Sequence, residues 1–233
     1  ALNGEATNCP SDGDNLGGRL GAVMGELAKA GRDKITLITS ASISSFGDWV
    51  EQLIAESTGK EGKGILPVVG ETVGTPDVYG NDRLFVYLRL NDEPTHDDAI
   101  AALKNAGHPV ITIALEDQYD LGGQYFLWEM ATAVAGQRLS INPFDQPNVE
   151  SAKVQARKMI TTYQETGELP TLEPTIQAEG MTIYGDTQAD TPLAALKAFI
   201  DSTEDGAYIS IHAYIHPTAE ANDALQTFQA TLR

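Results

Sequence analysis

The stretch NPFDQPNVESAK, residues 142–153, contains a polar turn between two prolines. Two basic residues with helical spacing, Lys153 and Arg157, follow this turn. Pro147 suits the first position of a helix, where its missing N–H leaves no hydrogen bond unmade. Gln146 or Asp145 then lies at the helix entrance, and counting in helical steps from Gln146 places Glu150, Lys153 and Arg157 on roughly one face. A helix N-terminus exposes backbone N–H groups and the positive end of the dipole, which favour phosphate. Gln146 could therefore hold an anionic group while Lys153 reaches toward the same pocket.

A plainer interpretation explains the same spacing. The segment could be a capped amphipathic helix whose lysine is only solvated. An apolar stripe runs beside the polar face and would pack on the protein core; it consists of Val149, Ala152, Ala156, Ile160 and Tyr163. The residues alone leave both interpretations open.

A second candidate for chemistry is Glu56, close to the end of the helix expected at residues 46–57. A carboxylate can act as a general base if its surroundings raise its pKa toward neutrality. Taken alone, Glu56 is better explained as a solvated helix residue, which could pair with Lys60 at the i+4 position.

Strands and helices alternate along the chain. Short β-branched or continuous apolar runs predict strands, and apolar residues at helical spacing predict helices. Thr95 is a plausible N-cap, and Gly31 and Gly107 are natural residues just past helix ends. Strands are expected at residues 34–40, 64–69, 83–90, 109–116 and 207–214; helices are expected at 18–31, 46–57, 94–107, 121–139, 147–164, 192–201 and the final residues.

Such alternation predicts about five strands in one parallel sheet that helices cover on both faces. The run at 109–116 is continuously apolar, as in a strand buried on both faces. In these sheets a ligand usually lies beyond the carboxyl ends of the strands, so the loops there are the first places to search. Residues 1–17 and 165–190 are compositionally loose.

Composition excludes several classes of function. The 233 residues carry a formal net charge of −18, which argues against nucleic acid because phosphate backbones are bound by clustered Lys and Arg. The single cysteine, Cys9, cannot form an internal disulfide. We find no signal peptide, and no apolar run approaches the roughly 20 residues that cross a bilayer. A cytoplasmic protein that contacts no membrane is expected.

Both ends suggest a piece of a longer polypeptide. The chain begins at Ala1 without Met, and it stops inside the helical pattern ALQTFQATLR without a Gly, Asn or Pro stop signal. A native end with a frayed helix is the alternative.

The stretch GQYFLWEMATAVAGQRLSINPFDQPNVESAK, residues 123–153, resembles a C-terminal signature of phosphoglucose isomerases. In that family an apolar helix leads into a Phe-Asp-Gln turn followed by Val-Glu-x-x-Lys. The resemblance implies an active-site role for Lys153 and a contact between Gln146 and the sugar phosphate. Asn148 stands where a glycine is frequent.

A second segment agrees with the first. The stretch WVEQLIAESTGKEGKGILPV, residues 49–68, is similar to the isomerase stretch in which a helix ends in Glu-Ser-x-Gly-Lys. The glutamate there is the catalytic base of the family, which implies that role for Glu56. Three segments, residues 18–40, 51–68 and 79–90, together most resemble the isomerase half of bacterial bifunctional transaldolase/phosphoglucose isomerases. In those proteins a transaldolase barrel precedes the isomerase half.

The resemblance implies a three-layer αβα sandwich of the sugar-isomerase, flavodoxin-like type, formed by residues 1–233 as a single subdomain. The expected reaction converts glucose 6-phosphate to fructose 6-phosphate through a cis-enediolate. Such proton transfer needs no cofactor and no metal. The hexose phosphate would be the substrate, and a homodimer is possible. A non-catalytic module that binds sugar phosphates for regulation is the alternative.

Two features of the family are missing here. Its members use a histidine for ring opening, but TVGTPDVYGNDRLFVYLRL contains none, and Asp82 or Arg83 falls nearest to the expected place. The ring-opening acid is therefore unassigned. No Ser/Thr-rich phosphate loop matches the first isomerase subdomain; TSASISSFG, residues 39–47, is the nearest hydroxyl cluster and suits a strand-to-helix loop capped by Ser44 or Ser45. The chain is expected to fold alone and to isomerise poorly.

Overall fold

A computed structural model describes residues 15–178, 180–204 and 206–232. Cys9 and most of the loose stretch 1–17 lie outside these residues. The chain divides into two compact units, Ala1–Ala152 and Lys153–Arg233. Whether residues 1–233 act as one sugar-isomerase subdomain stays a prediction.

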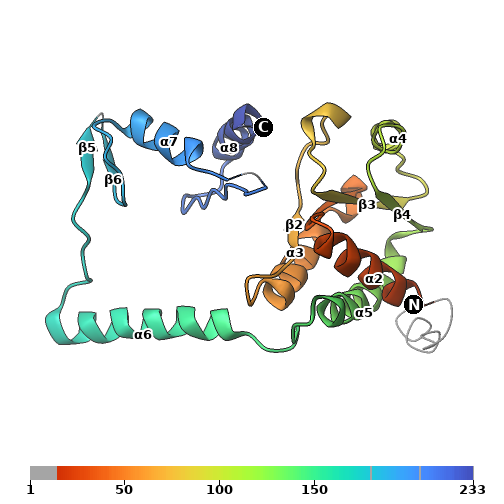
Figure 1. Ribbon diagram of the computed structural model, residues 1–233, viewed down its shortest axis with the longest axis horizontal. Coiled ribbons are helices and arrows are strands. Elements are labelled where there is room, and N and C mark those ends of the chain that lie inside the picture. Colours follow the sequence, from red (N-terminus) through yellow and green to blue (C-terminus); the bar gives the residue numbers. More distant parts are fainter. Residues whose placement is uncertain (1–14, 179, 205, 233) are drawn as a thin grey trace. The chain divides into compact units, whose positions relative to one another are not determined.

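The first unit is built on a parallel sheet whose strands lie in the order β2-β1-β3-β4 (Figure 1). The first residue of β1, Lys34, is in register with Leu66 of β2 and Arg83 of β3. The predicted α/β architecture is confirmed, with four strands among the described residues of the sheet in place of about five. Their bounds are β1 Lys34–Thr39, β2 Leu66–Val68, β3 Arg83–Leu90 and β4 Val110–Leu115.

Helices cover both faces of this sheet. One face packs on α2, α3 and α5 around Trp128, and the other packs on α4 around Phe85 and Tyr87 (Figure 1). Strand residues alternate between the two cores, because successive side chains of a strand point to opposite faces. The helix bounds are α2 Leu16–Lys29, α3 Ser45–Thr58, α4 Asp97–Asn105 and α5 Leu121–Leu139, with short 3-10 helices η1 Ala41–Ile43, η2 Pro76–Val78 and η3 Gln118–Asp120.

Two local predictions for this unit are wrong. Strand β4 is half-exposed along most of its length, because it forms an edge of the sheet and lacks a neighbour on one side. Helix α4 begins after His96 rather than Thr95, and His96 makes no side-chain cap hydrogen bond. Gly31 and Gly107 do follow helix ends, and both adopt the positive φ that favours glycine.

Close packing of α2 on α5 depends on glycine. A Cβ atom built on Gly21 would lie 2.2 Å from the backbone oxygen of Ala131 and 2.8 Å from Cβ of Val134. Gly17 and Gly25 meet α5 in the same way, one turn before and one turn after. The two helix backbones can therefore approach only while these positions lack side chains.

We expect Gly21→Ala to destabilise the first unit by about 1–3 kcal/mol, since overpacking a close helix contact forces backbone shifts. Urea unfolding followed by circular dichroism measures the change. Gly18→Ala is the control, because its Cβ would meet only the side chain of Asn15, at 3.2 Å. A loss equal to that of the control would contradict the packing argument.

The second unit contains most of a long helix, a small hairpin and two further helices. Few of its described side chains are buried; those that are belong to Ile176, Pro192 and Ala195. The predicted strand at 207–214 is wrong, because these residues form no regular element. The antiparallel pair β5–β6 was not predicted. The bounds are α6 Pro147–Thr166, β5 Ile176–Ala178, β6 Met181–Ile183, α7 Pro192–Asp201 and α8 Ala219–Leu232. Among the described helices none has the length and hydrophobicity to cross a membrane.

Candidate functional site

The turn that follows Glu56 lies at the amino end of the sheet. Helix α3 runs back along the sheet and ends at Thr58, and β2 then begins at Leu66, opposite the first residue of β1. The sequence predicted a ligand site beyond the carboxyl ends of the strands, whereas the turn after Glu56 lies at their amino ends.

A buried hydroxyl closes this turn. Thr58 Oγ1 donates to the carbonyl oxygen of Ile54 at 2.8 Å and accepts from the backbone N–H of Ile65 at 2.9 Å. Between these anchors the backbone passes through positive φ at Glu61, Gly62 and Gly64. The glycines make this path accessible at low steric cost. The turn is thus short, strained only at Glu61, and tied at both ends.

Lys60 joins this turn to the NPFDQP segment. Its ammonium contacts the carbonyl oxygen of Asn142 at 2.9 Å, the carboxylate Oδ1 of Asp145 at 2.9 Å, and the carbonyl oxygen of Asp145. Its side chain is only 3% exposed, whereas that of Asp145 is 55% exposed. The two sequence segments that carry the family resemblance therefore meet in the fold.

The start of α6 is tied to the same turn. Asn148 Nδ2 donates to the carbonyl oxygen of Gly59 at 2.8 Å. The backbone N–H of Glu150 donates to the carbonyl oxygen of Gln146 at 3.4 Å, so Gln146, one of the two residues predicted there, stands at the helix entrance. The Gln146 side chain is exposed there. Asn148, a departure from the frequent glycine, thus has a local structural role.

Glu56 lies in the last turn of α3 and is half-exposed. Its carboxylate accepts from Nε2 of Gln52, one turn earlier, at 3.5 Å. The alternative that paired Glu56 with Lys60 is wrong, because Lys60 forms its ion pair with Asp145. A carboxylate in this position, at the rim of a fixed turn, is accessible to a ligand.

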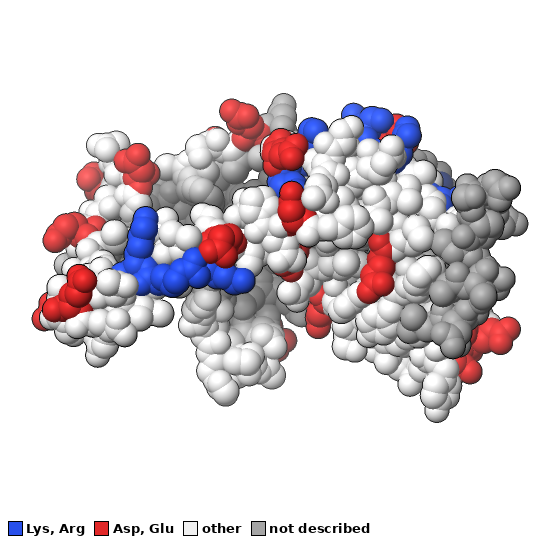
Figure 2. All heavy atoms as spheres, turned by 90° about the horizontal axis from the view of Figure 1, so that it is seen from below, with Lys and Arg blue, Asp and Glu red and all other residues white. Residues whose placement is uncertain are grey.

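Lys153 is the first residue of the second unit and lies exposed on α6. Arg157 and Lys158 follow on the same helix, and a view of the surface shows a band of basic side chains along α6 (Figure 2). In a protein with a formal net charge of −18, this band is a local concentration of positive charge. The assignment of Glu56, Lys153 and Gln146 to one site stays a prediction.

Asp82 and Arg83 are engaged elsewhere. Asp82 forms an ion pair with Lys34 at 3.1 Å, and Arg83 forms one with Glu71 at 2.9 Å. Arg83 also donates to Thr36 Oγ1 at 2.8 Å, on the sheet face that packs on α4 rather than α3. Both residues are therefore paired with side chains other than Glu56.

Lys34 adds charge to the same edge of the sheet. Burial lowers its pKa, but hydrogen bonds to Asp33 and Asp82 outweigh that effect, and the pKa is raised above its usual range. The ammonium therefore stays charged and serves its two carboxylates. Its role is to hold the strand ends together.

The hydroxyl cluster at 39–47 forms a strand-to-helix loop. Ser40 is fully buried, and its Oγ donates to the carbonyl oxygen of Glu93 at 2.9 Å. The carboxylate of Glu93 accepts from the backbone N–H of Ser42 at 3.2 Å, and hydrogen bonds from Ser42 lower the pKa of Glu93. Ser44 takes the N-cap position of α3 without a side-chain hydrogen bond. The backbone N–H of Ser42 is thus already paired with a carboxylate.

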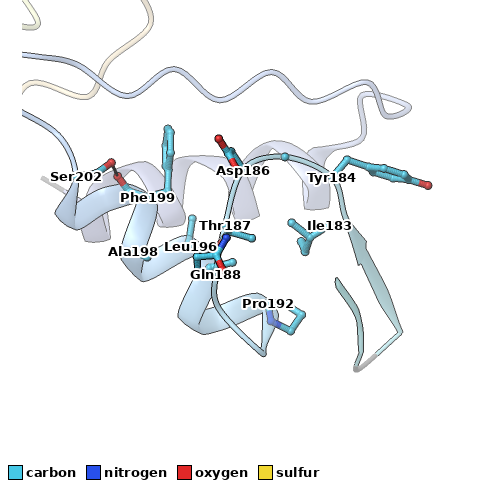
Figure 3. Close-up of a pocket in the computed structure, with 12 residues that line it drawn as sticks. Ile183, Tyr184, Asp186, Thr187, Gln188, Pro192, Leu196, Ala198, Phe199 and Ser202 are labelled. Carbon is cyan, nitrogen blue, oxygen red and sulfur yellow. Dashed lines mark hydrogen bonds between the residues drawn. The ribbon is translucent and has the colours of Figure 1, made fainter. Parts of the chain in front are cut away.

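A hollow of about 780 Å³ that the sequence did not predict lies in the second unit, between β6 and α7. Ile183, Leu196 and Phe199 border it (Figure 3). Asp186 is the charged residue in its lining, and its sign would repel a phosphate. The spacing of apolar residues in PLAALKAFID, residues 192–201, is the sequence feature that could have indicated this apolar hollow. Within the described residues, no group of three or more His, Cys, Asp or Glu could hold a metal ion.

The chain is similar in sequence to several glucose-6-phosphate isomerases. No family model matches the chain. Glucose-6-phosphate isomerase of Lactobacillus helveticus is 29% identical over 150 residues, which cover 48% of this chain and 34% of that protein. Glucose-6-phosphate isomerase of Methanocaldococcus jannaschii is 29% identical over 163 residues, which cover 54% of this chain and 40% of that protein.

Further relatives extend this result. The probable glucose-6-phosphate isomerase of Methanococcus maripaludis is 29% identical over 154 residues, covering 51% of this chain and 35% of that protein. The crystal structure of a hypothetical protein from Thermus thermophilus matches 63% of this chain and 50% of that chain, with a TM-score of 0.49 and 20% identity. The chain spans between 34% and 40% of the length of the three curated relatives. These sequence likenesses relate the chain to the phosphoglucose isomerase family.

Proposed function

We propose that this chain is the C-terminal subdomain of a glucose-6-phosphate isomerase. The observation that carries the proposal is the contact of Lys60 with Asn142 and Asp145, which brings together two segments that resemble the family. Similarity to curated glucose-6-phosphate isomerases over about half of the chain supports it independently.

In this proposal Glu56 is the general base. Glucose 6-phosphate and fructose 6-phosphate differ by a proton moved between C1 and C2, together with changes at the two oxygens. Glu56 takes the proton from C2 of the open-chain aldose and returns it to C1, with a cis-enediolate between the two steps. A carboxylate suits this exchange because it can both accept and donate within one site.

In this proposal Lys153 stabilises negative charge and Gln146 positions the substrate. The ammonium of Lys153 stabilises the negative oxygen of the enediolate, a kind of preorganised charge that is commonly worth a few kcal/mol. Gln146, at the entrance of α6, contacts the phosphate far from the reacting carbons, where binding energy fixes orientation. The proton transfer needs no nucleotide, since no hydride or electron is transferred, and in this proposal the ammonium of Lys153 supplies the positive charge.

We also propose which domains precede this chain in the parent protein. The likeness to bifunctional transaldolase/phosphoglucose isomerases suggests that a transaldolase barrel and a first isomerase subdomain precede this chain. Because that subdomain carries most phosphate contacts in the family, the 233 residues alone should isomerise poorly. The N-terminal sequence of the parent protein would decide whether these parts exist.

Turnover of fructose 6-phosphate by the full-length protein in D₂O tests the reaction. We expect glucose 6-phosphate to form and to carry deuterium at C2, because the base exchanges its proton with solvent. A regulatory module would bind the sugar phosphate without turnover or exchange. Absence of both from the full-length protein would overturn the enzyme assignment. Robust turnover by the 233-residue chain would contradict its proposed incompleteness.

A further inference from the structure

We propose that Lys60 is a positioning residue that holds Gln146 and the entrance of α6 against the turn after Glu56. This inference rests on the proposed function for its effect on the reaction, but the anchoring itself is a property of the first unit. The partners of Lys60 lie 82 and 85 residues away in the sequence.

The ammonium of Lys60 is matched by its surroundings. A lysine carries three N–H donors, and this one meets three acceptors: two carbonyl oxygens and a carboxylate oxygen. Burying an ammonium without such partners is costly, so the acceptors must stay where they are while the side chain remains buried. The buried lysine therefore dictates the position of residues 142–145.

Two further contacts limit movement of the same segment. The side chain of Asn148 reaches the carbonyl oxygen of Gly59 at 2.8 Å. On the other side, Pro143 lies so close to Gly136 of α5 that a Cβ there would be 2.8 Å from its Cγ. Gln146 lies between the Lys60 contact at Asp145 and the Asn148 contact, so its backbone is held from both sides.

Lys63 offers a matched contrast in the same turn. Within the described part of the chain its ammonium reaches a single acceptor, the carbonyl oxygen of Ser140 at 3.3 Å, and the residue is exposed. Lys60 and Lys63 thus share charge, side-chain length and local backbone, yet differ in burial and in the number of acceptors. Replacing either with methionine removes one positive charge and keeps most of the side-chain volume.

The decisive experiment compares Lys60→Met with Lys63→Met in the full-length protein. Loss of several charge-assisted hydrogen bonds should raise KM for fructose 6-phosphate about tenfold and change kcat much less, because the contact orients a binding group. Inhibition by inorganic phosphate should weaken by a similar factor. Lys63→Met should leave both quantities within about twofold of the wild type.

Hydrogen exchange supplies a readout that does not depend on activity. Amides of residues 142–150, apart from Pro143 and Pro147, which have none, should exchange faster in Lys60→Met, while amides of β3 stay protected. Unchanged exchange together with an unchanged KM would overturn the inference. A fall in kcat alone, with KM and phosphate inhibition intact, would also overturn it. If the wild type neither turns over nor binds the sugar phosphate, the proposed function fails while faster exchange still supports the anchoring.

A second variant keeps the test informative if Lys60→Met does not fold. Asn148 is exposed, so Asn148→Ala should fold normally and remove only the contact with Gly59. We expect a smaller rise in KM, about threefold, with faster exchange confined to the first turn of α6. A KM and an exchange rate equal to those of the wild type would count against the positioning role.

Discussion

Glu56→Gln in the full-length protein is expected to lower turnover by roughly 10²- to 10⁴-fold, the usual contribution of a general base. Glutamine keeps the size and the hydrogen-bonding oxygen of the side chain but cannot accept the C2 proton. Binding of the sugar phosphate should change little, because the contacts to the phosphate are assigned to other residues. The effect should therefore appear in kcat and leave KM nearly unchanged.

Glu51→Gln is the matched control for this variant. Glu51 is exposed and lies on the same helix, more than one turn before Glu56. Its replacement makes the same chemical change and should leave turnover within about twofold of the wild type. A coupled assay for glucose 6-phosphate formation measures both variants. If Glu56→Gln retained turnover equal to Glu51→Gln, the base would have to be another residue.

The regulatory alternative makes an opposite prediction for the same pair. A sensor needs a grip on phosphate but no base at the reacting carbons. In that case the wild type would bind the sugar phosphate without turnover. Glu56→Gln would bind it as the wild type does. Measurement of the wild type therefore has to come first, and it separates the two functions.

The second large effect concerns stability. Trp128→Ala should destabilise the first unit by about 3–5 kcal/mol, because it removes a large core side chain and leaves a cavity. Trp128 has no exposed surface and lies in the core formed by α2, α3, α5 and one face of the sheet. The midpoint of urea unfolding, followed by far-ultraviolet circular dichroism, reports the loss.

Trp128→Phe should cost much less than Trp128→Ala. The indole Nε1–H of Trp128 has no hydrogen-bond partner among the residues that the structure describes, so phenylalanine removes a buried donor that is not satisfied there. The remaining cost comes from the smaller ring. A Phe variant as unstable as the Ala variant would show that the indole N–H makes a stabilising contact, such as one to a buried water.

Several elements followed from local sequence alone. Helix 121–139, strand 83–90 and helix 192–201 have the predicted bounds, because the periodicity of apolar residues and the punctuation by glycine and proline act over a few residues. The turn before Pro147 and the place of Gln146 at the helix entrance are local in the same sense. The αβα architecture followed from the order of these elements.

Other features depended on neighbours that are distant in sequence. The run 207–214 has the composition of a strand but forms none, because a strand exists only when another strand supplies its hydrogen bonds. Strand β4 has the sequence of a central strand but lies at an edge, and only the strand order shows this.

Lys60 illustrates the division most clearly. Its spacing from Glu56 favoured an i+4 ion pair, but α3 ends at Thr58, so Lys60 lies outside the helix and the spacing rule does not apply to it. Its acceptors come from a turn more than 80 residues later. The sequence by itself determined the residue types, the helices and the strand runs, since these reflect local preferences. Only the tertiary structure decided which ammonium is buried and which turn it holds, because burial depends on what the rest of the chain places around it.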